Sequence, residues 1–216
     1  VLPKIVTTGF PSLSRQGLSS ISSILLNTAA GAYGDAAIAG MTITTKIVMF
    51  IASIMIGVGQ GFSPVSGYNF GAKRYDRVKQ AYTFTLTAGF ILMGSLATII
   101  FIFANQIMNA FINDLNVVKI GVAALRWQVA FLPFHSLIIG TNMLMQSTRH
   151  IKSATYLSMN RNGIYFIPAI LILPRVIGLQ GVEMAQFVAD VLSAITAVPF
   201  AIYFFKKMSN YNSEQN

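Results

Sequence analysis

The feature that most constrains the fold of this chain is the length of its uncharged segments. No Lys, Arg, Asp or Glu occurs in residues 47–72, 80–113 or 127–148. Each segment is long enough to cross a bilayer, which takes about 20 residues of helix. Of the 216 residues, 54% are hydrophobic and 10% are charged, whereas soluble domains carry about 25% charged residues. These values exclude an ordinary water-soluble globule.

The pattern predicts an all-α, polytopic membrane protein with six transmembrane helices. The predicted spans are residues 10–32, 36–60, 82–106, 118–144, 154–173 and 182–205. They form one transmembrane lobe of residues 1–205, followed by a polar cytoplasmic tail of residues 206–216. A soluble helical protein is disfavoured because residues 80–113 lack the polar face of a surface helix. A β-barrel is disfavoured because the apolar runs are continuous and do not alternate with period two.

The basic residues predict the orientation in the membrane. An even number of spans places both termini on one side, and cytoplasmic connectors carry the excess of Lys and Arg. Only Lys119 and Arg175 fall in the connectors of the opposite side. The connectors on the side of the termini contain Lys4, Lys73, Arg74, Arg77, Lys79, Arg149, Lys152, Lys206 and Lys207. We therefore predict cytoplasmic termini and a multi-pass protein of the plasma (bacterial inner) membrane.

The same distribution bears on the partners of the chain. A net charge of +9 suggests nucleic acid in a soluble protein, but here the basic residues punctuate apolar runs and form no single stripe. We expect membrane lipid as a partner and no nucleic acid.

Enzymatic chemistry finds no support in the residue pattern. The chain has no cysteine, so thiolate catalysis and cysteine-bound metals are excluded. His135 and His150 are its two histidines, and neither belongs to an HExxH motif. We expect no catalytic residue, no metal site and no bound cofactor.

Two further patterns predict local structure in the second span. Gly57 and Gly61 form a GxxxG pair, which is typical of close helix packing in membranes. Pro64, with Gly67 and Gly71, is expected to break the helix at the membrane interface.

Polar side chains at helical spacing inside the spans are the candidates for function. Such groups normally face the interior of a bundle or a hydrated cavity. The stripes are Gln16, Ser20, Ser23 and Asn27 in the first span, Gln128, His135, Asn142 and Gln146 in the fourth, and Glu183, Gln186, Asp190 and Ser193 in the sixth. We expect these stripes, with Met49 and Arg161, to line one substrate cavity. Each polar residue alone could instead join helices by hydrogen bonds.

Asp190 is the one acid placed well inside a span. A carboxylate in that position could exchange protons or bind an ion, as in proton relays of transporters. It could instead form a structural ion pair with a basic residue such as Lys46 or Arg161. The charged residues within the spans are four basic ones, Arg15, Lys46, Arg126 and Arg161, and this one acid.

Residues 54–81, IMIGVGQGFSPVSGYNFGAKRYDRVKQA, resemble the loop signature of the multidrug and toxic compound extrusion (MATE) transporters. In that family a glycine-rich helix end leads to a G-(Y)-N-x-G-A-K loop and an arginine. The matching residues are Gly67, Tyr68, Asn69, Gly71, Ala72, Lys73 and Arg77. Residues 9–17 (GFPSLSRQG), 111–126 and 160–190 are similar to the family as well. Arg149 and His150 depart from it, because the family often has a glycine there.

The resemblance implies a secondary active multidrug efflux antiporter. Such transporters have twelve helices in two six-helix lobes around a central cavity, and they exchange small cationic or amphipathic molecules for protons or sodium ions. This chain looks like the C-terminal lobe, which leaves the missing N-terminal six-helix lobe as its partner. The first, second, fourth and fifth helices would line the cavity.

Two alternatives stay open. The excess of basic residues inside the spans suits a flippase of an anionic lipid-linked precursor from the same superfamily. A truncated membrane subunit that does not transport is the other.

The predicted topology can be tested by cysteine labelling, because the chain has no native cysteine. A cysteine at Lys73 should resist an impermeant maleimide in intact cells and react after the cells are opened, because we place it on the cytoplasmic side. Labelling of intact cells at this position would show that the topology is inverted.

Overall fold

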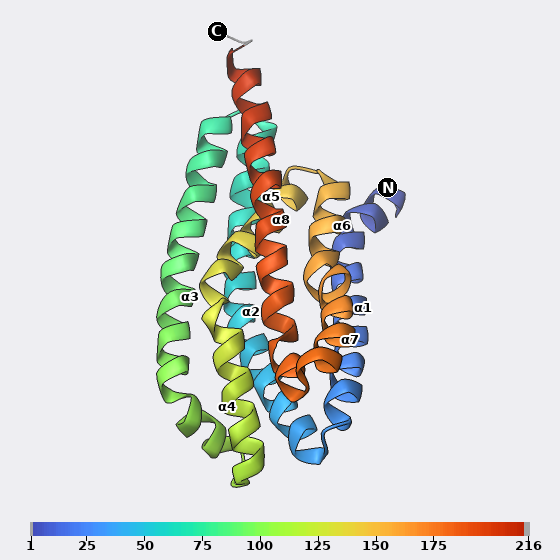
Figure 1. Ribbon diagram of the computed structural model, residues 1–216. Helices are drawn as coiled ribbons and strands as arrows, with labels where there is room; N and C mark the ends of the chain where they lie inside the picture. The colour runs from blue at the N-terminus through green and yellow to red at the C-terminus, as the bar shows by residue number, and fades with distance from the viewer. Residues whose placement is uncertain (1, 214–216) are drawn as a thin grey trace.

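The computed structural model describes residues 2–213 and the side chains of residues 12–208. Its long helices are α1 (Leu2–Gly31), α2 (Asp35–Gly71), α3 (Tyr75–Phe111), α4 (Leu115–Ala130), α5 (His135–Ser147), α6 (Ile151–Met159), α7 (Phe166–Ile177) and α8 (Leu179–Ser213). A 3-10 helix, η1 (Leu132–Phe134), joins α4 to α5, and a π-helix, η2 (Asn160–Ile164), joins α6 to α7. The elements therefore form six rods in an elongated bundle, with the two termini at the same end (Figure 1).

The fold class predicted from the sequence is confirmed. By length and composition, α2, α3 and residues 179–208 of α8 can each cross a membrane, and the bent pair α4–α5 makes a fourth span if it counts as one. The rods α1 and α6–α7 are not among these spans, so the predicted total of six stays a prediction. Phe84, Ile91 and Ile102 on α3 are 60–75% exposed, which is the surface that lipid would cover.

The core lies where α2 crosses the other rods. One cluster joins α2, α3 and α4 around Met55, Met93 and Met108, and two others join α2 to α5 and α8 and to α1 and α7. Gly40 lets α2 approach α4, because a Cβ there would meet the carbonyl oxygen of Val117 at 3.1 Å. Small residues allow such approach of helix backbones in membranes.

Two of the six rods are broken, one at a proline and one at a π-helical turn. Pro133 lies in η1, where α4 and α5 meet at an angle of 44°, because proline has no N–H for the helical ladder. In the fifth rod the N–H of Tyr165 bonds to the carbonyl of Asn160, five residues back. This wider turn is a π-bulge, a feature that is frequent at functional sites.

The structure corrects two local predictions, at Pro64 and at the GxxxG pair. The helix α2 continues through Pro64 to Gly71, because a proline removes one hydrogen bond and the rest of a long packed helix holds the turn. A Cβ added at Gly57 or Gly61 would meet no atom of the described structure within 4 Å, so this GxxxG pair packs no helix within the lobe. The helix α8 runs on through Ser213, so residues 206–213 are helical, and their role as a polar cytoplasmic tail stays a prediction.

The family-signature residues form the turn between α2 and α3. Asn69 donates to the carbonyl of Val65 at 2.8 Å, Gly71 ends α2, and Arg77 lies in the first turns of α3. Ala72 and Lys73 connect the two helices, and Lys73 has a φ of 57°. The α5–α6 turn repeats this geometry at Arg149, with a φ of 62°, which explains why glycine suits that position in the family.

These two turns pack against each other at the end of the bundle that also holds the C-terminus. Gly67 of α2 lies against Ser147, and Ser147 donates to the hydroxyl of Ser66 at 3.0 Å. The imidazole of His150 packs against Phe70 and Phe204, which also contact each other. Its partial burial is the main cause that lowers the pKa of His150, Lys207 adds to this, and the hydrogen bond with the backbone of Thr148 opposes it in part. His150 is therefore a neutral packing group at pH 7.

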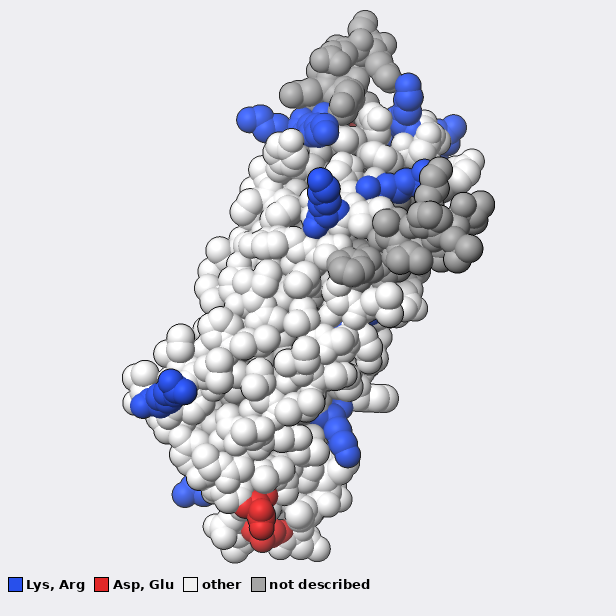
Figure 2. All heavy atoms as spheres, turned by 90° about the vertical axis from the view of Figure 1, so that its right-hand side faces the viewer, with Lys and Arg blue, Asp and Glu red and all other residues white. Residues whose placement is uncertain are grey.

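Lysines and arginines are concentrated toward this same end of the molecule, although others lie in the opposite half, where most of the acidic surface in view is found (Figure 2). We call the first the basic end. The connector geometry agrees with the predicted sidedness, because the α2–α3 and α5–α6 turns both lie at this end (Figure 1). Which membrane face the basic end meets stays a prediction, and the side chain of Lys4 lies outside the described residues.

The turn between α7 and α8 provides a test of the packing. A Cβ at Gly181 would lie 2.3 Å from the carbonyl carbon of Leu173 and 2.5 Å from the nitrogen of Pro174. We expect Gly181→Ala to cost about 1–3 kcal/mol, because backbone atoms would have to move. The measurement is thermal unfolding in detergent.

The matched control is Gly94→Ala on α3, where the nearest atom would be Pro133 Cγ at an ordinary 3.8 Å. It should be neutral or slightly stabilising, because alanine favours helix over glycine. Equal melting temperatures for the two variants would contradict the proposed close approach.

Candidate functional site

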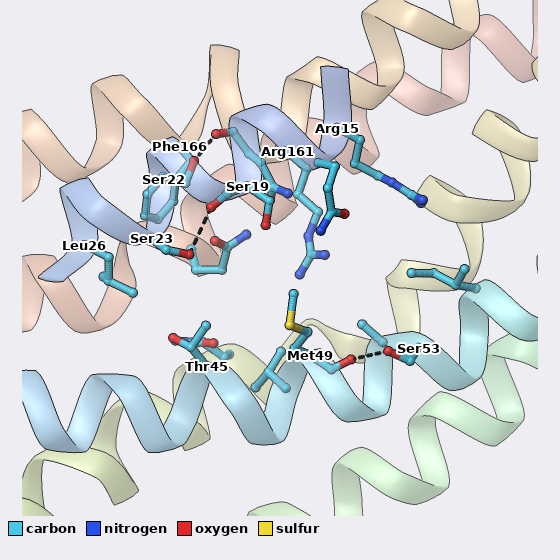
Figure 3. A pocket seen from close by; sticks show the side chains of 17 residues that line it. Arg15, Ser19, Ser22, Ser23, Leu26, Thr45, Met49, Ser53, Arg161 and Phe166 are labelled. Atoms are coloured by element: carbon cyan, nitrogen blue, oxygen red, sulfur yellow. Dashed lines mark hydrogen bonds between the residues drawn. The ribbon is translucent and has the colours of Figure 1, made fainter. Parts of the chain in front are cut away.

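A cavity of about 290 Å³ opens between α1 and α2 (Figure 3). Arg15, Gln16, Ser19 and Ser23 line it from α1, and Thr45, Met49 and Ser53 face them from α2. Gln128 of α4, Phe166 of α7 and Gln186 of α8 complete the wall with Arg161 and Asn162 of the π-bulge. The lining mixes hydroxyls and amides with apolar side chains, which is the composition of a small-molecule site.

The π-bulge positions the central arginine of this cavity. Ser22 donates a hydrogen bond to the carbonyl of Asn162, and Gly163 allows the side chain of Leu18 to approach it closely. These contacts fix α1 on the bulge. In Figure 3 the guanidinium of Arg161 extends into the space between α1 and α2.

Arg161 forms an ion pair with Asp190 behind the cavity wall. Its Nε donates to Oδ1 of Asp190 at 2.6 Å, and Gln186 Nε2 donates to the same oxygen at 3.0 Å. Oδ2 of Asp190 lies 3.0 Å from Nε2 of His135. Asp190 is 1% exposed and Arg161 is 22% exposed. The carboxylate is thus compensated from three sides, while the arginine still reaches the cavity.

This arrangement identifies the partners of Asp190, while its part in ion coupling stays a prediction. Its partner among the two basic candidates is Arg161, and Lys46 is exposed on α2. A buried ion pair with extra hydrogen bonds is the structural alternative of the sequence analysis. Because the acid is covered, the charged groups of the cavity lining are Arg15 and Arg161.

Two buried polar groups next to the pair have no hydrogen-bond partner among the described residues. They are Nδ1 of His135 and the side-chain amide of Asn160. Both stand at helix breaks, since His135 begins α5 and Asn160 begins η2. Buried polar groups are normally paired. A change in helix packing or in hydration near either group would therefore alter its hydrogen bonding.

The structure brings together part of the predicted site. Gln16, Ser23, Met49 and Arg161 line the cavity. Ser20 and Asn27 are exposed on α1 outside its lining. The lining of α1 is Arg15, Gln16, Ser19, Ser22, Ser23 and Leu26, so it keeps two of the predicted residues but is centred nearer the N-terminal neighbours of Ser20 and Asn27. The helical period was predicted correctly, but its phase was rotated, because neighbouring helical residues point about 100° apart.

The predicted stripe of the fourth span is divided by the break at Pro133. Gln128 reaches the cavity, while His135 lies behind the wall against Asp190. Asn142 donates to the carbonyl of Ala154 at 2.8 Å, and Gln146 donates to Asn142. Asn142 thus joins α5 to α6, Gln146 supports it from the same helix, and neither residue lines the cavity. Residues seven apart lie on one face only in a continuous helix. The break at Pro133 ends that relation between Gln128 and the residues of α5.

Sequence reasoning missed the π-bulge and the role of its neighbours. A signal was present, because the polar run of residues 160–163 interrupts an apolar helix and Pro168 follows. Arg15, which the sequence analysis did not include among the cavity residues, lines the cavity as well.

Comparison with known proteins identifies the class that this fold and cavity define. The MatE family model matches residues 11–171. The chain belongs to this family.

The similar curated proteins are multidrug export proteins MepA. The protein of Staphylococcus saprophyticus is 24% identical over 198 residues, which cover 92% of this chain and 44% of the relative. The protein of Staphylococcus haemolyticus is 23% identical over 203 residues, which cover 94% of this chain and 44% of the relative. The chain therefore spans a little under half the length of these relatives.

Solved structures show the same fold. The outward-facing conformation of a multidrug resistance MATE family transporter of the MOP superfamily superposes with a TM-score of 0.89 at 20% identity. The match covers 97% of this chain and 48% of the other. A MOP superfamily transporter from Pyrococcus furiosus, described as having a binding pocket of reverse polarity, gives 0.89 at 20% identity over 96% of this chain and 47% of the other. The described residues thus have the architecture of about half of such a transporter.

The ion pair predicts an asymmetry between two conservative substitutions. Arg161→Gln leaves the carboxylate of Asp190 buried without its cation, which should cost about 3 kcal/mol. Asp190→Asn should cost less, because the partly exposed Arg161 can turn toward the cavity. Unfolding of both variants in detergent gives the comparison.

The double variant completes the cycle. Its cost should be about 1–3 kcal/mol smaller than the sum of the two single costs, because contacting residues are not additive. Additive costs would mean that the two side chains do not stabilise each other.

Proposed function

We propose that this chain is one six-helix lobe, the C-terminal one, of a multidrug efflux antiporter. The observation that carries the proposal is the cavity between α1 and α2, open to one side and lined by hydroxyl, amide and apolar groups. The likeness to multidrug export proteins supports it, since both the family and the fold agree. A second six-helix lobe would close the cavity from its open side.

The mechanism we propose is alternating access. Substrate sites of secondary transporters lie near the midplane between two repeats, and one repeat rocks against the other around that site. The exposed Met49 and the apolar Phe166 would accept the hydrophobic part of different substrates. The hydroxyls of Ser19 and Ser23 would accept hydrogen bonds from their polar parts.

The energy source in this proposal is a gradient of protons or sodium ions. No P-loop motif occurs in the sequence, so the chain offers no ATP site of that type. Asp190 is assigned a structural role, because Arg161, His135 and Gln186 occupy its carboxylate. The coupling acid then belongs to the other lobe.

A second candidate, a flippase of an anionic lipid-linked precursor, is favoured by one observation. The charged residues in the cavity lining are the two arginines, Arg15 and Arg161. Arginine is the preferred partner of phosphate and carboxylate groups. Acids supplied by the other lobe would remove this preference, whereas a second basic lobe would strengthen it.

Transport by the complete gene product that contains this chain tests the proposal. Everted vesicles should take up a cationic dye such as ethidium when a proton or sodium gradient is imposed. A protonophore should stop the uptake if protons are the coupling ion, and omission of sodium should stop it if sodium is. Uptake of an anionic lipid-linked substrate without dye uptake would favour the flippase, and transport of neither would favour a subunit that does not transport.

The cavity itself is tested by filling it. Ser23→Trp should reduce the initial rate of dye transport at least tenfold, because the indole would occupy much of a cavity of about 290 Å³. Ser95→Trp on the exposed face of α3 is the matched control and should transport normally. Equal rates in the two variants, at equal amounts of folded protein, would refute the cavity as the substrate site.

A further inference from the structure

A second hollow lies between α3 and α8, on other faces of the bundle than the cavity described above. It has a volume of about 620 Å³ and is lined by apolar side chains of α3, α5 and α8. At one end it carries two lysines, Lys79 of α3 and Lys206 of α8. No Asp or Glu belongs to this lining, and Asp76, three residues before Lys79, lies outside it.

The floor of the hollow is formed by a buried tyrosine whose polar atom is hydrogen-bonded within the protein. Tyr82 is buried, and its hydroxyl is hydrogen-bonded to Thr141 at 2.8 Å. Its ring packs on Phe205 with 5.1 Å between centroids. The hollow therefore presents aromatic and aliphatic surface, with its polar atoms concentrated at the lysine end.

The hollow continues toward the middle of the bundle. A neighbouring one of about 320 Å³ shares Leu86 and Leu137 with it and extends to Ile91 and Phe134. We call the two together the α3–α8 groove. From Lys79 to Ile91 the helix rises about 18 Å, close to the roughly 15 Å depth of hydrocarbon in one leaflet.

The two lysines mark the edge of the hydrocarbon on their helices. Residues 80–113 after Lys79 and residues 191–205 before Lys206 contain no charged side chain. Both lysines lie toward the basic end, where α3 begins and α8 approaches the C-terminus (Figure 1). An occupant therefore needs an anionic group at the interface and an apolar chain one leaflet long.

We propose that the α3–α8 groove binds an anionic phospholipid of the leaflet at the basic end. Its phosphate lies between Lys79 and Lys206, and one acyl chain follows the groove past Leu86 toward Phe134. Basic pockets between transmembrane helices recognise anionic headgroups in this way. A zwitterionic lipid fits the apolar part equally well but lacks the net charge that the lysines select. The site does not depend on which substrate the cavity takes.

The test is native mass spectrometry of the complete gene product in detergent, with dioleoyl phosphatidylglycerol or dioleoyl phosphatidylcholine added. The native protein should bind the anionic lipid about 30-fold more tightly, because each lysine at a membrane surface contributes about a factor of five. The double variant Lys79→Gln/Lys206→Gln should lose this preference. The control Lys73→Gln/Lys152→Gln removes two exposed lysines outside the groove and should keep it.

Several outcomes would overturn the proposal. One is equal binding of the two lipids by the native protein, and another is an equal loss of preference in the control. A third is a dimer whose formation excludes lipid, because a second copy of the protein would then be the occupant of the groove. If the groove variant does not fold, the proposal is tested by the fluorescence of a bimane label on a cysteine that replaces Ile202. Brominated phosphatidylglycerol should quench it at lower mole fraction than brominated phosphatidylcholine, whereas a label at Ile195 should respond equally to both.

The two label positions are matched, since Ile202 and Ile195 both lie on α8 and are 63% and 62% exposed. Ile202 lines the groove and Ile195 does not. Equal quenching of both labels by both lipids would show that the groove is ordinary lipid-facing surface.

Discussion

The need to pair every backbone N–H and C=O group inside the membrane governs the whole structure. Hydrocarbon offers these groups no hydrogen bonds, so an irregular backbone is tolerated only where protein covers it or a watery cavity meets it. The two breaks in this bundle obey that rule. The 3-10 turn at Pro133 lies against α3 and α4, and the π-bulge at residues 160–164 lies between α1 and α8. Both breaks place polar side chains where a straight helix would not.

The site follows from those breaks. The first sets His135 at the start of α5, and the second aims Arg161 past the wall formed by α8. Asp190 holds the two together, because its oxygens accept from Arg161 and meet His135. One buried carboxylate therefore links the last three rods of the chain, α4–α5, α6–α7 and α8. The burial of Asp190 also determines the electrostatics of the cavity. Arg161 lines the cavity, whereas Asp190 lies behind its wall.

The two hollows of the lobe differ in chemistry as well as in position. The α1–α2 cavity is lined by polar groups of five rods and suits a molecule that enters from the bundle side. The α3–α8 groove is apolar along its length and basic at its end, which suits a molecule that is already in the bilayer. The groove, and not the cavity, depends on the long apolar run of α3 and on the uncharged residues 191–205 of α8. The two hollows have no lining residue in common.

The sequence by itself determined the fold class, the approximate positions of the rods, the family, and the residue types that the cavity would use. These follow from the absence of charge over long runs and from short motifs, both of which are local properties of the chain. The tertiary structure alone decided the phase of the stripe on α1, the pairing of Asp190 with Arg161 in place of Lys46, and the removal of Asn142 and Gln146 from the cavity. The physical reason is that a helix break or a π-bulge rotates everything beyond it, and whether one forms depends on the neighbouring rods that satisfy the freed backbone groups.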